Sequence, residues 1–255
     1  SDKTDDNIAE LSVSGGSDND LSEDGKQIAF ISRGEVFVAS TEYNTVKQIT
    51  DTPEAEADVV FSPDGKTLAY ASEREGIWNI YTAELVRKED ISFPYATLIE
   101  EKPLFKNNKV DRRAPVYSPD GKELAYIEDR DRLMIMNLET GKTRQITDGS
   151  QCYSTTGSFA YSWSPDGKWI LMSYCARNHY PYDDIGIVST KGGEPMINLT
   201  ESGYTDSAPQ WVLGGNAILF ASERYGMRNH ASWGTLEDVM IVFLNRKAYD
   251  DFKMT

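Results

Sequence analysis

Five times along this chain, an apolar residue is followed by a polar turn and then by an apolar strand. The clearest copy is FSPDGKTLAYAS at residues 61–72, whose second half favours a β-strand. In its turn, proline fixes its own φ, aspartate caps the backbone through its side chain, and glycine accepts a positive φ. The copies are centred, at intervals of 40 to 56 residues, on Gly25, Gly65, Gly121, Gly167 and Gly215. Such spacing suits four-stranded propeller blades better than helical solenoid repeats.

Each repeat continues with a third apolar strand, and these strands begin at Gly34, Ile77, Leu133, Asp184 and Asp238. A fourth strand ends three of the repeats in a shared phrase: VKQIT to Thr50, TRQIT to Thr147 and MINLT to Thr200. Four strands per repeat predict an all-β fold, a β-propeller of about five four-stranded antiparallel blades.

The repeats predict one propeller domain or propeller fragment over residues 1–255. The expected blades are residues 8–50, 51–102, 111–148, 155–200 and 205–245, with an insertion at 87–110 and a long loop at 225–236. The final NRKAYDDFKMT favours a helical turn, so we expect the last blade to lack an outer strand. IAELSV at 8–13 either supplies that strand and closes the ring or is the tail of an upstream blade.

Charge narrows the choice of partner. The formal net charge is −15, which argues against nucleic acid or an anionic membrane because both require a cationic face. Apolar runs fall short of the roughly 20 residues of a membrane-spanning helix, and we expect no membrane insertion. The first ten residues also lack the apolar centre of a signal peptide. We expect Cys152 and Cys175 to be free thiols, because the predicted strand pairing places Cys175 opposite about Gly157, and a disulfide would require the loop to fold back.

Motifs of known chemistry are missing from the sequence. It contains no GxSxG, HExxH or paired CxxC and no glycine-rich phosphate loop. SDNDLSEDG at 17–25 resembles a calcium loop but lacks glycine at its sixth position and glutamate at its twelfth, so we expect a hydrophilic turn there. We therefore predict no catalytic residue, no metal site and no cofactor in this chain.

An arginine follows the anchor glycine by nine residues in three repeats, at Arg74, Arg130 and Arg224. This register places each arginine in the turn between the second and third strands of its blade. The three guanidinium groups are candidates for binding the carboxylates of peptides or sugars. Alternatively, each arginine pairs with an acidic residue of the connection between blades, such as Glu56 or Asp206.

The long loop near the C-terminus holds a second candidate surface. His230 and Trp233 lie in it, and both combine apolar area with hydrogen-bonding groups, as recognition surfaces require. The alternative is that this loop packs on its own blade.

Several phrases resemble a known family of repeats. SPDGK-x-LAY at Ser62–Tyr70, continuing to Tyr81, is similar to the WD40-like repeat of TolB and of tricorn-type proteases. RGEVFV at 33–38, ASEREGIWNIY at 71–81, ESGYTDSAPQW at 201–211 and DVMIVFLNRKAYDDF at 238–252 resemble the later propeller blades of bacterial tricorn-like proteases. In that family these blades precede a PDZ domain and a serine-peptidase domain.

The resemblance implies a non-catalytic propeller segment of a tricorn-like serine peptidase, which admits or guides peptides and acts as a scaffold. Tricorn propellers have six or seven blades, so the five repeats here are either a complete ring or part of a larger one. A stand-alone TolB-like module that binds a protein partner is the alternative, and an enzyme with an active site at the channel mouth is a third hypothesis. For a tricorn-like protein the periplasm or the exterior is favoured, with the cytoplasm as the alternative.

Overall fold

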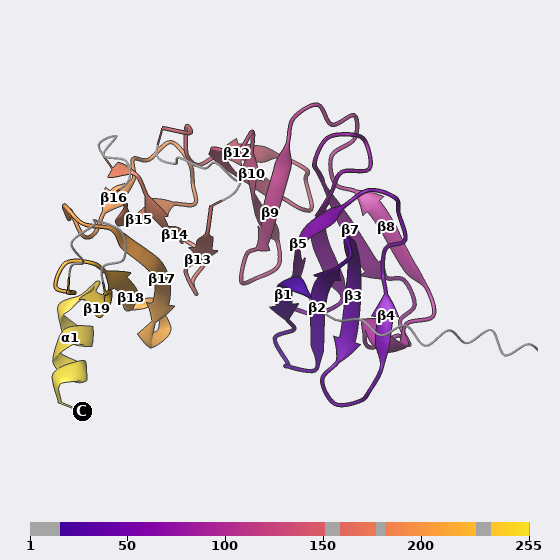
Figure 1. The fold of residues 1–255 in the computed structure, drawn as a ribbon, viewed down its shortest axis with the longest axis horizontal. Coiled ribbons are helices and arrows are strands. Elements are labelled where there is room, and N and C mark those ends of the chain that lie inside the picture. Colours follow the sequence, from indigo (N-terminus) through magenta and orange to yellow (C-terminus); the bar gives the residue numbers. More distant parts are fainter. Residues whose placement is uncertain (1–15, 151–158, 177–181, 228–235, 255) are drawn as a thin grey trace, which may run out of the picture.

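The computed structural model describes residues 16–150, 159–176, 182–227 and 236–254. Its strands form five antiparallel sheets, and each sheet is built from strands that are consecutive in the chain (Figure 1). Four of these sheets have four strands, and the fifth has three. The predicted all-β propeller fold is confirmed. Within the described residues, the last blade lacks its outer strand, as the sequence also predicted.

The strands are as follows. Blade 1 comprises Ser17–Leu21 (β1), Gln27–Ser32 (β2), Glu35–Ser40 (β3) and Val46–Gln48 (β4). Blade 2 comprises Glu56–Phe61 (β5), Thr67–Ser72 (β6), Asn79–Leu85 (β7) and Ile99–Pro103 (β8). Blade 3 comprises Arg112–Tyr117 (β9), Glu123–Glu128 (β10), Arg132–Asn137 (β11) and Thr143–Gln145 (β12).

Blade 4 comprises Tyr161–Trp163 (β13), Trp169–Tyr174 (β14), Asp184–Ser189 (β15) and Ile197–Asn198 (β16). Blade 5 comprises Asp206–Val212 (β17), Ala217–Ser222 (β18) and Asp238–Phe243 (β19). Short 3₁₀ turns occupy Phe93–Tyr95 and Leu213–Gly215. The helix α1 spans Arg246–Lys253, and Asn245 caps its N-terminus by accepting a hydrogen bond from the Ala248 amide.

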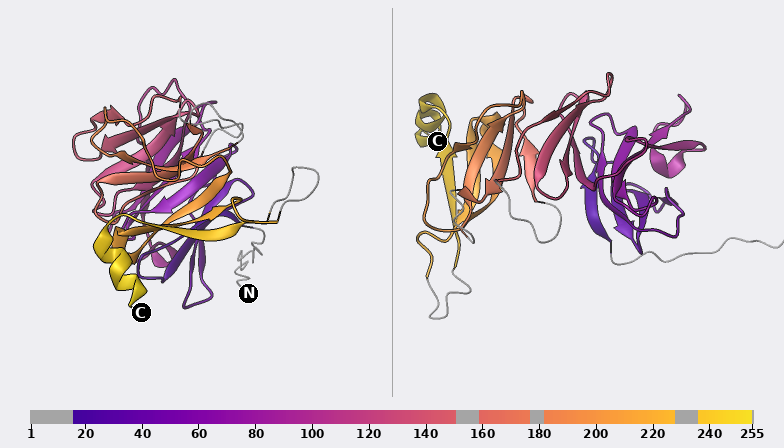
Figure 2. Two further views of the ribbon diagram at one scale, coloured as in Figure 1. Left: turned by 90° about the vertical axis from the view of Figure 1, so that its left-hand side faces the viewer. Right: turned by 90° about the horizontal axis from the view of Figure 1, so that it is seen from above.

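The blades follow one another along an arch. Figure 1 shows the first strand of each blade, β1, β5, β9, β13 and β17, on the inner side of this arch. Blade 5 with α1 lies at one end of the arch, and the view from above in Figure 2 shows blades 1 and 2 at the other, with blades 3 and 4 between them. The turns at the two ends of each blade therefore form two different faces of the molecule.

Hydrophobic clusters lie between consecutive blades. Because side chains alternate between the two faces of a strand, the second strand of each of blades 2, 3 and 4 contributes to two of these clusters. In β6, Leu68 and Tyr70 pack toward blade 1, whereas Ala69 packs toward blade 3. In β10, Leu124 packs toward blade 2 and Ala125 toward blade 4. Four clusters join blades 1 and 2, 2 and 3, 3 and 4, and 4 and 5, and none among the described residues joins blade 5 to blade 1.

The repeated Ser-Pro-Asp-Gly turn closes a hairpin within its blade and also packs against the turn of a neighbouring blade. The Ser62 hydroxyl donates to Asp64 at 2.6 Å and accepts the Thr67 amide at 3.0 Å, which closes the turn. In blades 3, 4 and 5, the glycine of the anchor turn (Gly121, Gly167 or Gly215) lies against the proline of the preceding blade, whereas Gly65 of blade 2 faces Gln27 and Ser22 of blade 1. A Cβ on Gly121, where φ is +69°, would lie 3.5 Å from Pro63, so the turns stack on one another along the arch.

Carboxylates tie the inner strands of blades 1, 2 and 3 together. The Phe61 amide of blade 2 donates to Asp20 of blade 1 at 2.7 Å, although burial raises the pKa of this carboxyl group. Asp58 joins blade 2 to blade 3 in the same way. Its carboxylate accepts a hydrogen bond from the Ala114 amide of blade 3 at 2.9 Å and two from the Arg113 guanidinium, at 2.9 and 3.2 Å. Asp58 lies in a bulge of β5, with a φ of +57°. The bulge turns its side chain from its own sheet to the neighbouring blade.

Replacing Asp58 with asparagine is expected to lower the free energy of unfolding by about 2 kcal/mol, because the Arg113 guanidinium loses its charged partner. Asparagine has nearly the same shape and tolerates the positive φ, so Asp58→Asn isolates the charge. Urea denaturation measures the change. The exposed Asp51 is the control, and Asp51→Asn is expected to change the stability by less than about 0.5 kcal/mol. Equal effects of the two variants would contradict a stabilising role for the Asp58 carboxylate.

Candidate functional site

The turns between the second and third strands lie together at one end of the blades, which we call the arginine end. Arg33 occupies this turn in blade 1, Arg74 in blade 2, Arg130 in blade 3 and Arg224 in blade 5. The Ser-Pro-Asp-Gly turns lie at the opposite end, which we call the anchor end. The strands separate the two ends because each anchor turn and each arginine turn close opposite ends of the same second strand.

Arg74 is held by two carboxylates of its own blade. Its Nε donates to Glu56 Oε1 at 3.0 Å, and its Nη2 donates to Glu101 Oε2 at 2.6 Å. The Tyr70 hydroxyl donates to the same Glu101 oxygen at 2.5 Å, and the guanidinium lies 4.7 Å from the centre of the Tyr81 ring. The Arg74–Glu56 pair joins the first strand of blade 2 to its second turn, so this ion pair lies within the blade and does not connect two blades.

Burial sets the electrostatics of this cluster. The Glu56 side chain has no exposed area, and its burial raises the pKa of the carboxyl group against the opposing effect of Arg74. The Glu56 Oε2 atom is buried without a hydrogen-bond partner in the described structure. Burial and the hydrogen bond to Glu101 together raise the pKa of Tyr70, so its phenol stays protonated. Arg74 is therefore the cation that keeps Glu56 ionised inside the blade.

The other predicted arginines have different surroundings. Arg130 is exposed, with a φ of +74°, and its guanidinium makes no ion pair or hydrogen bond with the described residues. Arg224 is half-buried and donates to the Thr200 carbonyl at 3.4 Å. Asp206, the expected partner of Arg224, is fully buried, and both of its carboxylate oxygens lack a hydrogen-bond partner in the part of the chain that the structure describes. The arginines thus share a position in their blades but not a set of contacts.

Some of the predicted positions fall outside the described residues. These are His230 and Trp233 of the long loop, Cys152, and the proposed closing strand at residues 8–13. Cys175 is half-buried at the end of blade 4. The recognition role of His230 and Trp233, and the free thiols, therefore stay predictions.

Two arginines that sequence reasoning missed lie at the start of β9. Arg112 pairs with Glu128 at 2.8 Å and lies 4.1 Å from the centre of the Phe105 ring, while Arg113 pairs with Asp58 and lies 4.4 Å from Trp78. Blade 3 thus reverses the charges of blade 2, with the cation on the first strand and the carboxylate on the second. The consecutive arginines in DRRAPV are the signal that could have identified this position.

Two further properties bear on the chemistry of the site. Among the described residues, no group of three or more histidine, cysteine, aspartate or glutamate side chains is arranged to hold a metal ion. In the same part of the chain, no helix has the length and apolar character needed to cross a membrane.

Solved structures with the same blade arrangement are found among propeller proteins. The tricorn protease structure has a TM-score of 0.65 at 17% identity, covering 90% of this chain and 21% of that one. TolB from Acinetobacter baumannii has a TM-score of 0.57 at 19% identity, covering 90% of this chain and 52% of that one. The chain has the fold of these propellers. The resemblance predicted from the repeats is thereby confirmed at the level of fold.

The sequence relatives are 28% identical to this chain and match it over only part of their own length. The Tol-Pal system protein TolB of Francisella tularensis is 28% identical over 205 residues, covering 75% of this chain and 42% of that protein. The uncharacterized peptidase YuxL of Bacillus subtilis is 28% identical over 144 residues, covering 54% of this chain and 20% of that protein. This chain therefore spans between a fifth and about two fifths of the relatives that it matches. No protein-family model matches it.

Replacing Arg74 with methionine is expected to lower the free energy of unfolding at pH 7 by about 3 kcal/mol, because Glu56 would remain buried without its cation. The deficit depends on pH with a defined sign. Because the pKa of Glu56 is higher in the folded protein than its ordinary value of 4.5, the protonated carboxyl group favours the folded state. This contribution to stability is fully present below pH 4.5 and is lost as the pH rises through the pKa of the folded state. Without Arg74 this pKa rises further, so the deficit of Arg74→Met should shrink from pH 7 to pH 4.

Urea denaturation at the two pH values measures this effect. Arg130→Met is the matched control, because the same substitution at the equivalent but exposed turn should change the stability by less than about 0.5 kcal/mol at either pH. A deficit of Arg74→Met that is the same at pH 4 and pH 7 would contradict the role assigned to the Glu56 charge.

Proposed function

We propose that this chain is a non-catalytic propeller segment of a tricorn-like serine peptidase, which admits or guides peptides and serves as a protein scaffold. The arch supports this proposal, because its four inter-blade clusters leave the two end blades without a shared cluster among the described residues. Further blades fit such an arch. The similarity to the tricorn protease structure and to a relative named as a peptidase points to the same parent class.

The exposed guanidinium of Arg130 carries the proposed peptide-binding role. Arg74 already has two carboxylate partners, whereas Arg130 occupies the equivalent turn and is exposed to solvent. An arginine binds a carboxylate through two parallel hydrogen bonds, and a peptide carries such a group at its C-terminus. Arg130 is thus the strongest candidate for this contact.

The other predicted residues extend the same proposed surface. Arg224 has a single long bond to a backbone carbonyl, which a ligand carboxylate can replace. We assign His230 and Trp233 to the surface from their residue types and their place in the loop that follows the Arg224 turn. Arg74 takes part by holding the turn of blade 2 in place between those of Arg33 and Arg130.

A stand-alone TolB-like module that binds a protein partner is the second candidate. It is favoured by the coverage of the TolB similarity, which extends over 75% of this chain. The coding sequence that follows Thr255 distinguishes the two candidates: PDZ and peptidase domains there support the first, and a stop codon supports the second. For the tricorn-like protein we propose a periplasmic or secreted location.

Substituting Arg130 by glutamine is expected to weaken the binding of a neutral hexapeptide with a free C-terminal carboxylate by about fivefold, through loss of the paired hydrogen bonds. The same peptide as its C-terminal amide should bind both proteins equally. Fluorescence anisotropy with a labelled peptide measures both affinities.

Lys122→Gln is the matched control, because Lys122 is exposed on the same blade at the anchor end and its loss changes the net charge by the same amount. If the lysine variant weakens binding as much as Arg130→Gln, net charge rather than the arginine end explains the affinity. If neither substitution changes the affinity, the proposal that Arg130 binds the peptide carboxylate is wrong.

A further inference from the structure

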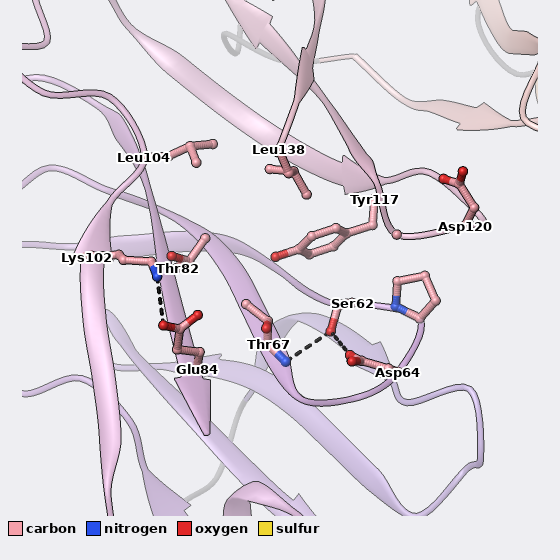
Figure 3. A pocket seen from close by; sticks show the side chains of 12 residues that line it. Ser62, Asp64, Thr67, Thr82, Glu84, Lys102, Leu104, Tyr117, Asp120 and Leu138 are labelled. Carbon is pink, nitrogen blue, oxygen red and sulfur yellow. Dashed lines mark hydrogen bonds and ion pairs between the residues drawn. The ribbon is translucent and has the colours of Figure 1, made fainter. Parts of the chain in front are cut away.

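A cavity of about 410 Å³ opens between blades 2 and 3 at the anchor end, away from the arginines (Figure 3). This volume lies within the range of roughly 300–1,000 Å³ that is usual for small-molecule sites. Strand β7, strand β8 and the anchor turn of blade 2 form one wall, and residues of blade 3 form the other. The side chains that decide its chemistry are Thr82, Glu84, Lys102, Leu104, Tyr117 and Leu138.

One polar group in the wall lacks the hydrogen bond that its burial requires. Thr82 is only 5% exposed, and its hydroxyl oxygen has no hydrogen-bond partner in the described structure. A buried hydroxyl without a partner destabilises the folded protein by about 1–3 kcal/mol. The Thr82 side chain lines the cavity, and a threonine hydroxyl can occupy other staggered positions about the Cα–Cβ bond. A ligand hydroxyl would then supply the missing partner.

Tyr117 contributes a second hydroxyl from the opposite blade. Figure 3 shows its ring extending across the cavity, with the hydroxyl directed toward Thr67 and Thr82. Burial raises the pKa of this phenol, so it remains a neutral donor. The hydroxyl makes no hydrogen bond with the described residues. Two hydroxyl-bearing side chains from two blades, Thr82 and Tyr117, therefore line the same space.

A single ion pair completes the polar side of the cavity. Lys102 donates to Glu84 Oε1 at 2.7 Å, across neighbouring strands β7 and β8. The remaining Lys102 protons and the second Glu84 oxygen offer both donors and acceptors to a ligand. Asp64 and Asp120 also line the cavity, so its lining contains three carboxylates and one ammonium group. This balance opposes the entry of an anion.

The remaining wall is apolar. Leu104 and Leu138 face the cavity from blades 2 and 3, and the Pro63 ring and the Tyr117 ring extend this surface. A ligand that fits must present hydroxyl groups on one side and C–H groups on the other, without negative charge. The hydroxyl groups of a sugar both donate and accept, and the faces of its ring carry C–H groups.

We propose that this cavity binds a neutral, hydroxyl-rich ring of monosaccharide size. Its hydroxyl groups bond to Thr82, Tyr117 and the Glu84–Lys102 pair, and its C–H face packs on Leu104 and Leu138. This site is separate from the arginine end and from the peptide binding proposed there.

Titration of the chain with D-glucose, D-galactose and D-mannose, followed by saturation-transfer NMR and calorimetry, tests the proposal. We expect saturable binding of at least one of these sugars and none of D-glucose 6-phosphate. Thr82→Val replaces the hydroxyl with a methyl group of the same shape and should weaken binding by about five- to tenfold, the loss expected for one hydrogen bond. Tyr117→Phe should weaken it to a similar extent.

Stability separates a lost ligand contact from a damaged fold. Thr82→Val should leave the melting temperature unchanged or higher, because it removes a buried hydroxyl that has no partner, and Thr143→Val on the exposed strand β12 should alter neither property. Failure of all three sugars to saturate the unaltered chain at millimolar concentrations would overturn the proposal. Unchanged affinity in both Thr82→Val and Tyr117→Phe, or equal binding of the phosphorylated sugar, would also overturn it.

Discussion

The stacking of each blade on the next holds this fold together, because a small antiparallel sheet has two faces and can cover neither of them alone. In blades 2, 3 and 4, apolar side chains on alternate positions of the second strand enter different clusters, as Leu68 and Ala69 do. Each of these three blades therefore depends on both neighbours at once. Stability along the arch is then a sum of contacts between nearest neighbours, as in other repeat proteins.

Polar groups reinforce this stacking at specific points. Asp58 accepts hydrogen bonds from the next blade, and the anchor turns of blades 3, 4 and 5 lie against the proline of the blade before them. The charged groups at the arginine end act differently, because the Arg74 and Arg112 ion pairs close their own sheets. Contacts within a blade thus fix the turns, while contacts between blades fix their relative positions.

The two ends of the blades differ in what they present. The arginine end carries guanidinium groups that range from the fully paired Arg74 to the exposed Arg130. At the anchor end, the cavity between blades 2 and 3 presents hydroxyl groups and one ion pair. In a protein with a large negative net charge, the arginine end thus exposes the Arg130 guanidinium, while the lining of the cavity contains one ammonium group and three carboxylates.

The sequence by itself determined the blades, the order of their strands and the short last blade. These features depend on contiguous residues: the Ser-Pro-Asp-Gly turn closes through its own side chains, and the strands follow from local alternation. The sequence also located Arg74, Arg130 and Arg224 by counting from each turn. Only the tertiary structure decided which of them is free, since Arg74 meets Glu101, which lies 27 residues away in the chain. The Asp58–Arg113 pair and the convergence of Thr82 with Tyr117 arise between blades, where the stacking and twist of two sheets set the contacts.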